Sequence, residues 1–121
     1  MTMDFRTISV PELARRVREK ELTAREVVGA SLERIDALNP ALNAFVAVDA
    51  ERAIEQAGAV DQLVATGGDP GPLAGIPIGV KDGEDASGYR TTRGSRLFAT
   101  APPAVHDSVL VARLRAAGAV V

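Results

Sequence analysis

The sequence contains no cysteine and no tryptophan, and it has a single histidine. Because there is no cysteine, the chain can hold neither a disulfide framework nor a thiolate nucleophile. Aromatic residues make up only 3% of the 121 residues, so any core must be built from alanine, valine, leucine and isoleucine. Apolar residues nevertheless account for 46% of the chain, which is enough for the core of one domain or of part of a larger one.

A strong charge of one sign is also absent, since 14 basic residues stand against 16 acidic ones. A nucleic-acid footprint requires clustered positive charge, so this balance argues against nucleic acid as a partner. No apolar run approaches the ~18 residues that indicate a transmembrane helix. The opening residues MTMDFRTISV lack the apolar stretch of a signal peptide. We therefore expect a cytoplasmic protein with no nucleic-acid or membrane partner.

Residues 9–66 contain the start and stop signals of three helices. Capping boxes at SVPE (9–12) and TARE (23–26) predict the starts of two helices, and Asp49 is typical of the N-cap of a third. Asn39-Pro40 should stop the second helix, because the residue before proline avoids the helical region. Apolar residues at helical spacing follow the three caps: Leu13, Ala14 and Val17; Val28, Leu32 and Ile35; Ala53, Ala57, Val60 and Val64.

The second half of the sequence changes its pattern. After a loop at 67–74, the apolar run GIPIGV (75–80) predicts a buried strand, with Pro77 at a strand start or edge. Glycines and prolines over 83–104 predict a loop. Asp107 is expected to cap a fourth helix that ends at Gly118, and AVV (119–121) should begin another strand.

This order of elements predicts an α/β fold. N-terminal helices over 9–66 would precede a loop at 67–74 and then strand, loop and helix over 75–121. A strand that is apolar on both faces expects cover on both faces and neighbours at both edges. We therefore expect residues 1–121 to be a truncated part of a single domain.

Lys81 follows the apolar run directly and precedes Asp82. A phosphate-binding loop would need G-x-x-x-x-G-K-[ST], and the spacing here does not fit. A surface lysine paired with Asp82 or Glu84 agrees with the local sequence. A catalytic base is a further alternative, because α/β sheets carry their sites at the carboxyl ends of strands. An ordinary lysine, with a pKa of ~10.4, is protonated at pH 7, so a lysine base must be desolvated.

Four segments carry a resemblance to a known family. They are LERIDALNPALNAFVAV (32–48), GPLAGIPIGVKD (71–82), TTRGS (91–95) and DSVLVARLRAAGAVV (107–121). Together they resemble the amidase signature family of serine amidohydrolases, in one order and over almost the whole chain. In that family the lysine in this context belongs to a Ser–cis-Ser–Lys triad. The resemblance therefore implies that Lys81 is the catalytic lysine.

The resemblance also implies the chemistry. Lys81 would take a proton from a bridging serine, which in turn activates a nucleophilic serine. An acyl-enzyme forms, ammonia or an amine leaves, and water releases the acid. The family needs no metal or cofactor, so none is expected. In the family the segment that holds both serines lies downstream of the position of Val121, and no serine of this chain is assigned as nucleophile. The resemblance therefore implies that 1–121 is the N-terminal part of a single amidase domain with a mixed sheet, and that it is inactive as an enzyme when alone.

The remaining polar residues are interpreted as structural. Ser9 and Ser31 are cap-like or helical, and TTRGS (91–95) is taken as a supporting loop whose hydroxyl groups bind backbone groups. His106 is expected at a helix start and outside catalysis. Glu84 and Asp85 are adjacent acids in a glycine-rich loop and are expected to be solvated. Gly83 replaces the bulkier residue that often follows Lys-Asp in the family, which would loosen the loop after Lys81.

We predict an amidase that cleaves the C–N bond of a small-molecule carboxylic amide. One alternative is the glutamine-hydrolysing subunit of a tRNA-dependent amidotransferase, from the same family, although KDGEDASGYRTT (81–92) is more similar to the stand-alone amidases. A second alternative is a non-catalytic truncated polypeptide, because the two serines are missing. The sequence does not define the amide, and it is compatible with a homo-oligomer.

Overall fold

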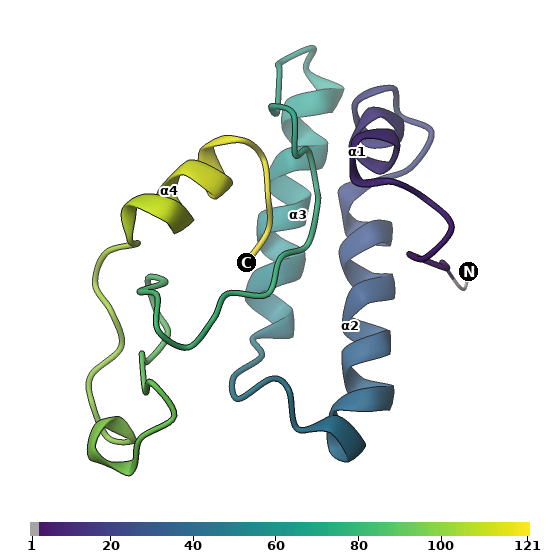
Figure 1. Ribbon diagram of the computed structural model, residues 1–121. Coiled ribbons are helices and arrows are strands. Elements are labelled where there is room, and N and C mark those ends of the chain that lie inside the picture. The colour runs from purple at the N-terminus through teal and green to yellow at the C-terminus, as the bar shows by residue number, and fades with distance from the viewer. Residues whose placement is uncertain (1–2) are drawn as a thin grey trace.

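A computed structural model describes residues 3–121. Its elements are α1 (Val10–Arg18), α2 (Ala24–Leu42), α3 (Ala50–Ala65), the short 3-10 helix η1 (Arg96–Phe98) and α4 (Val109–Ala116). Helices α2 and α3 run antiparallel beside each other, while α1 is seen nearly end-on beside the start of α2 (Figure 1). A long loop, broken only by η1, connects α3 to α4, and the chain ends next to α3.

The predicted caps of α2 and α3 are confirmed. The Thr23 hydroxyl accepts a hydrogen bond from the Glu26 amide at 3.1 Å, and the Glu26 carboxylate accepts from the Thr23 amide at 2.7 Å, which completes the capping box. The Asp49 carboxylate accepts from the Arg52 amide at 3.0 Å at the start of α3. These starts depend on contacts within three residues, so they could be read directly from the sequence.

The predicted capping box of α1 is only half formed. Ser9 accepts from the Glu12 amide at 3.3 Å, as expected. The Glu12 carboxylate, however, binds the guanidinium groups of Arg15 at 2.8 Å and Arg16 at 3.0 Å, and does not return to the Ser9 amide. Those two hydrogen bonds lower the pKa of Glu12 to about 2. The charged guanidinium groups one turn away therefore bind the Glu12 carboxylate in place of the Ser9 amide.

The predicted stop of α2 at Asn39-Pro40 is wrong, because the helix continues through Pro40 to Leu42. Proline lacks an N–H group, so it removes one hydrogen bond, yet the turn around it still closes through the Asn43 amide and the Asn39 carbonyl at 2.7 Å. Asn43 then ends the helix in a left-handed conformation, with φ of 51°. A proline in the last turn is tolerated where the following residues cap the helix.

The predicted capping role of Asp107 is also wrong. Ser108 caps α4 by accepting a hydrogen bond from the Val111 amide at 3.3 Å. Asp107 accepts instead from the Ser87 amide at 2.7 Å and pairs with Arg115 at 2.9 Å. Both residue types are good N-caps, so the sequence alone did not decide which of the two neighbours would take the position.

The core lies between the helices and the segment that follows α3. Most of the apolar positions expected from helical spacing are buried, with alanine allowing close approach of α1, α2 and α3. The buried cluster comprises Leu13, Ala14, Val17, Ala24, Val27, Val28, Ala53, Ala57, Ala74, Ile76 and Val120. Because Ala74, Ile76 and Val120 belong to this cluster, residues 74–76 and the C-terminal residues pack against the helices.

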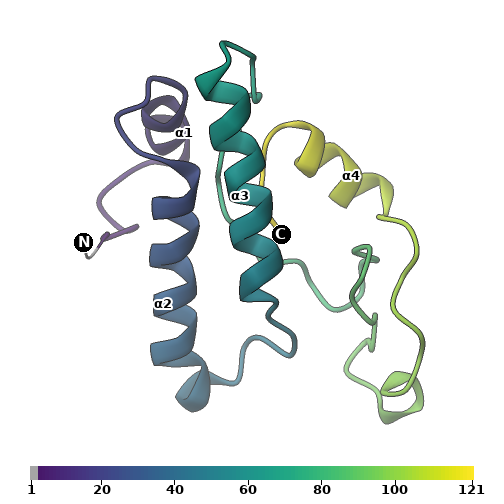
Figure 2. The same ribbon diagram turned by 180° about the vertical axis from the view of Figure 1, so that it is seen from behind.

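The two predicted strands meet, but only as a single parallel bridge between Pro77 and Val120. The Ile78 amide donates to the Val120 carbonyl at 2.8 Å, and the Val120 amide donates to the Ile76 carbonyl at 2.9 Å. These bonds are made by the residues on either side of Pro77, so the missing N–H group of Pro77 does not disturb the bridge, and no longer ladder forms in the described residues. Both segments lie on the same side of α3, in front of it in Figure 1 and behind it in Figure 2.

Candidate active site

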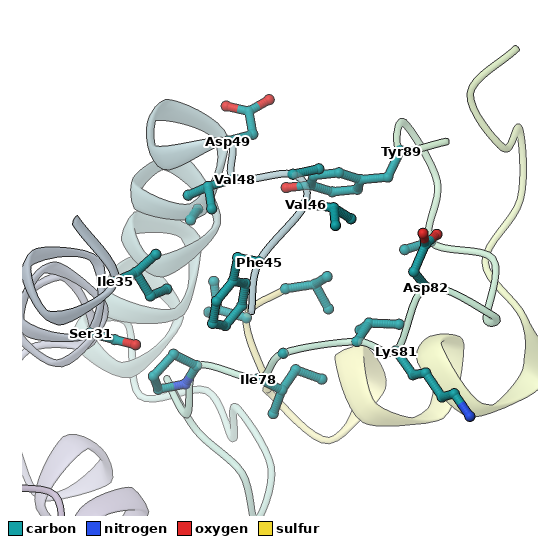
Figure 3. Close-up of a pocket in the computed structure, with 18 of the residues that line it drawn as sticks. Ser31, Ile35, Phe45, Val46, Val48, Asp49, Ile78, Lys81, Asp82 and Tyr89 are labelled. Atoms are coloured by element: carbon teal, nitrogen blue, oxygen red, sulfur yellow. The ribbon is translucent and has the colours of Figure 1, made fainter. Parts of the chain in front are cut away.

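Lys81 lies three residues beyond the bridged segment and is exposed. Its side chain extends away from Phe45 and Tyr89, which line the neighbouring cavity (Figure 3). Neither Asp82 nor Glu84 pairs with it, and no ion pair among residues 3–121 includes Lys81. The burial expected of this side chain in a complete enzyme is therefore not provided by the residues that surround it here.

The backbone at Lys81 is nevertheless well held. Its carbonyl accepts a hydrogen bond from the Glu84 amide at 3.0 Å, which closes a turn. The carboxylate of Asp82 accepts from the Thr92 amide at 2.6 Å and from the Thr92 hydroxyl. The hydroxyl bond, followed by the amide bond, holds the pKa of Asp82 below its ordinary value. Asp82 is thus ionised, and its carboxylate is surrounded by neutral hydrogen-bond donors.

A cavity of about 550 Å³ lies beside this turn. It is bounded by one face of α2, by the connection between α2 and α3, by the bridged segment and by the loop after Lys81 (Figure 3). Its apolar lining includes Val28, Leu32, Ile35, Phe45, Val46, Val48, Ile78, Val80 and Val120, and its polar lining includes Ser31, Asp49, Lys81, Asp82, Glu84, Tyr89 and Arg90. A mostly apolar hollow with a few polar groups in its lining is typical of small-molecule sites.

Two aromatic side chains define the walls of this cavity. Phe45 is fixed from α2, because its amide donates to the Asn39 side-chain oxygen at 2.8 Å and its carbonyl accepts from the Asn39 side-chain nitrogen at 3.1 Å. Tyr89 lies under the Arg52 guanidinium, which is 5.5 Å from the ring centroid. Burial, together with the negative charge of Asp49, raises the pKa of the Tyr89 phenol. Sequence reasoning assigned no role to either aromatic residue, although both lie in segments that were compared with the family.

The segment TTRGS (91–95) has a supporting role that agrees in part with the prediction. Thr92 binds Asp82, and Ser95 caps η1 by accepting from the Leu97 amide at 3.2 Å. Gly94 has the expected positive φ, of 67°. Thr91 and Thr92 differ from the expectation, because the Thr91 hydroxyl donates to the Asp85 carboxylate at 2.6 Å and the Thr92 hydroxyl donates to the Asp82 carboxylate, and neither donates to a backbone group.

Four of the five serines have structural roles. Ser9, Ser95 and Ser108 are N-caps, and the Ser87 hydroxyl donates to the Val105 carbonyl at 3.2 Å. Ser31 lies on α2 at the end of the cavity opposite to Lys81 (Figure 3). The serines of this chain therefore form no pair beside the lysine.

The other candidate polar residues are spread over the loop. His106 is exposed just before α4. Glu84 is half-buried at the cavity, while Asp85 is exposed and binds Thr91. Within residues 3–121 no group of three or more histidine, aspartate or glutamate side chains is arranged to hold a metal ion. None of the helices described is long and apolar enough to cross a membrane.

Comparison with known proteins shows the family to which this chain belongs. The family model described as Amidase matches residues 26–121. The A subunit of glutamyl-tRNA(Gln) amidotransferase from Carboxydothermus hydrogenoformans is 38% identical over 118 residues, which are 98% of this chain and 24% of that protein. The chain belongs to the amidase signature family.

Two solved structures share the fold. The native peptide amidase from Stenotrophomonas maltophilia matches with a TM-score of 0.85 and 35% identity, over 94% of this chain and 23% of that one. A chain from a vestigial protein complex, described as revealing the origins of an s-triazine catabolic enzyme, matches with a TM-score of 0.89 and 40% identity, over 93% of this chain and 25% of that one. The chain thus spans about a quarter of the length of the relatives that it matches.

Proposed function

We propose that the natural protein containing this chain hydrolyses a small-molecule carboxylic amide through an acyl-serine intermediate, and that Lys81 is its proton-accepting group. The observation that carries the proposal is the position of Lys81, three residues beyond the bridged segment and at the rim of a mostly apolar cavity, in a chain of the amidase signature family. The anchored backbone around Lys81 supports the proposal, because a catalytic base must be held in one place.

In the proposed reaction, Lys81 accepts a proton and later returns it. Neutral Lys81 accepts a proton from a bridging serine, the bridging serine accepts one from the nucleophilic serine, and the nucleophile forms an ester bond with the amide carbon. The departing nitrogen takes a proton back through the same relay and leaves as ammonia or an amine. Water then attacks the ester by the same proton path and releases the acid. The two serines are those that the family resemblance implies, outside the 121 residues.

Lys81 must be neutral to perform this step, and a lysine in water is not. We propose that the segment bearing the two serines covers the Lys81 side chain, which is exposed among the residues described. Removal from water disfavours the charged ammonium form and makes a neutral amine accessible near pH 7. This arrangement would couple assembly of the serines to activation of the lysine.

The test is the variant Lys81→Ala in the natural protein, with Lys20→Ala as the matched control. Lys20 is the other lysine of the sequence, and it is exposed at the end of α1. We expect Lys81→Ala to abolish amide hydrolysis and Lys20→Ala to leave it unchanged, with both variants folded. Retention of kcat/KM within about tenfold by Lys81→Ala, about 1.4 kcal/mol of barrier, would make the assignment of the base wrong.

A second candidate function is glutamine hydrolysis as one component of a tRNA-dependent amidotransferase. The observation that favours it is that curated relatives 38% to 46% identical to this chain are the A subunits of glutamyl-tRNA(Gln) amidotransferases. The two candidates differ in their requirement for a partner. The natural protein should be assayed alone against aliphatic amides, aromatic amides and glutamine. Turnover of simple amides supports the first candidate, while strict dependence on glutamine and on a second protein supports the other.

A further inference from the structure

The residue that follows Lys81 is held at both its side chain and its backbone. The Asp82 carboxylate accepts from the Thr92 amide at 2.6 Å and from the Thr92 hydroxyl, and the Asp82 carbonyl accepts from the Arg93 amide at 2.9 Å. These three hydrogen bonds, which we call the Asp82–Thr92 clamp, join two points of the chain that are ten residues apart.

The clamp requires an uncommon backbone conformation. Arg93 has φ of 53° and Gly94 has φ of 67°, so two consecutive residues occupy the left-handed region. Glycine adopts this region freely, whereas a side chain such as that of Arg93 costs about 1–2 kcal/mol there. Strain of this kind persists only where surrounding contacts maintain it, and it is enriched at functional sites. Here the contacts that maintain it are those to Asp82 and the hydrogen bond from the Ser95 amide to the Thr92 carbonyl at 2.9 Å, which closes a turn around Arg93 and Gly94.

Beyond the clamp, the backbone on this side of Lys81 is held by the turn that the Lys81 carbonyl closes with the Glu84 amide at 3.0 Å. Gly83, which lies inside that turn, has open space where a side chain would be, so packing does not hold it. On the other side, the Ile78–Val120 hydrogen bond secures the segment that leads to Lys81. The lysine therefore lies between two anchors, the parallel bridge before it and the Asp82–Thr92 clamp after it.

We propose that Asp82 and Thr92 are positioning residues that set the place and direction of the Lys81 side chain for proton transfer. The inference rests on the proposed function of Lys81. An ionised Asp82 strengthens the clamp, because a charged acceptor makes stronger hydrogen bonds than a neutral one, and the lowered pKa of Asp82 keeps it ionised at neutral pH. Loss of the clamp would free the backbone on one side of the lysine, and a displacement of about 1 Å can cost about 100-fold in rate.

The test compares two neighbouring threonines in the natural protein. Asp82→Ala removes both side-chain bonds of the clamp, and Thr92→Val removes its hydroxyl bond, whereas Thr92→Ser keeps the hydroxyl group. Thr91→Val is the matched control that removes the hydroxyl bond to Asp85. The readouts are kcat and KM for a simple amide, with folded protein quantified by circular dichroism and Lys81→Ala in the same series. We expect kcat of Thr92→Val and Asp82→Ala to fall about 100-fold with KM changed less than about threefold. Thr92→Ser should recover most of the rate, and Thr91→Val should match the unmodified protein.

The outcomes separate this inference from the proposed function. If Lys81→Ala is inactive while Thr92→Val and Asp82→Ala keep full kcat, the positioning role is wrong and the base assignment stands. A fall in activity that matches a loss of folded protein, without recovery in Thr92→Ser, would show a purely structural clamp and would also overturn the inference. If Lys81→Ala remains active, the proposed function and the positioning role fail together.

Discussion

The amide of Ile78 donates a hydrogen bond to the carbonyl of Val120 at 2.8 Å. This bond joins the segment that leads into Lys81 to the residues that follow α4. The Val120 amide donates in turn to Ile76, so the two segments are tied in both directions. The position of the candidate catalytic lysine thus depends on a part of the chain that is distant in sequence. Substitutions in that part should therefore affect the position of Lys81.

A substitution at Gly118 should weaken this connection. Gly118 has φ of 99°, and a Cβ atom there would collide with the Pro70 carbonyl oxygen. Gly118→Ala should therefore lower the stability of the natural protein by about 1–3 kcal/mol, through strain and through separation of the two segments. A thermal melt followed by circular dichroism should show a lower melting temperature.

The control for this variant is Gly29→Ala. Gly29 lies inside α2, and a Cβ atom there meets nothing within 4 Å. Alanine in a helix is more stable than glycine by about 0.5–1 kcal/mol, so the melting temperature should stay the same or rise. Equal melting temperatures for Gly118→Ala and the unmodified protein would contradict the role of the close approach at Gly118.

The position of Phe45 in the cavity wall should depend on the side chain of Asn39. Asn39→Ala removes both of the hydrogen bonds to the Phe45 backbone, whereas Asn39→Asp keeps the acceptor and loses the donor. We expect faster hydrogen exchange of the Phe45 amide in Asn39→Ala, corresponding to a loss of about 0.5–1.5 kcal/mol per hydrogen bond. In Asn39→Asp the amide should stay protected.

Asn43→Gly is the control for that experiment. Asn43 has a positive φ that glycine adopts without strain, and its hydrogen bond to the Asn39 carbonyl is made by the backbone. Exchange at Phe45 should therefore be unchanged in this variant. Equal protection of Phe45 in Asn39→Ala and the unmodified protein would show that the side chain of Asn39 does not hold the connection between α2 and α3.

Local signals explain which parts of the fold could be predicted. The capping box of Thr23 and Glu26 uses contacts within one turn, so the sequence contains all of the information. The continuation of α2 through Pro40 depends on the residues after the helix, and the choice of Ser108 over Asp107 depends on Ser87 and on α4. Both predictions were wrong because contacts beyond the motif decided between locally similar alternatives.

The candidate site, like the fold, could be predicted only where local sequence signals define it. The place of Lys81 at the end of an apolar run, and its match to a known family, were available from the sequence. The partner of Asp82 was not, because Thr92 is ten residues away with no periodic pattern between them. Phe45 and Tyr89 likewise reach the cavity from different loops, which only the folded backbone brings together.

The 121-residue chain by itself should bind an apolar dye and should not react with a serine-directed fluorophosphonate. Large apolar side chains are openly exposed, with Leu97 at 88%, Val105 at 78% and Val46 at 72% of their full accessibility. Such side chains attract dyes and favour self-association. Because none of the five serines lies beside Lys81, we expect none of them to be activated as a nucleophile. Stoichiometric labelling, or a single sharp urea transition from a monomer, would contradict this expectation.

The most direct test of the central claim is the kcat/KM of Lys81→Arg in the natural protein, measured for a simple amide beside Lys20→Arg. Arginine keeps the positive charge and much of the length of lysine, but it cannot lose its proton near neutral pH. If Lys81 accepts a proton, Lys81→Arg should lose at least about 100-fold in kcat/KM, since general-base catalysis contributes about 100- to 10,000-fold. Lys20→Arg should equal the unmodified enzyme. Activity of Lys81→Arg within about tenfold of the unmodified enzyme would contradict the account, because only the charge of Lys81 would then matter.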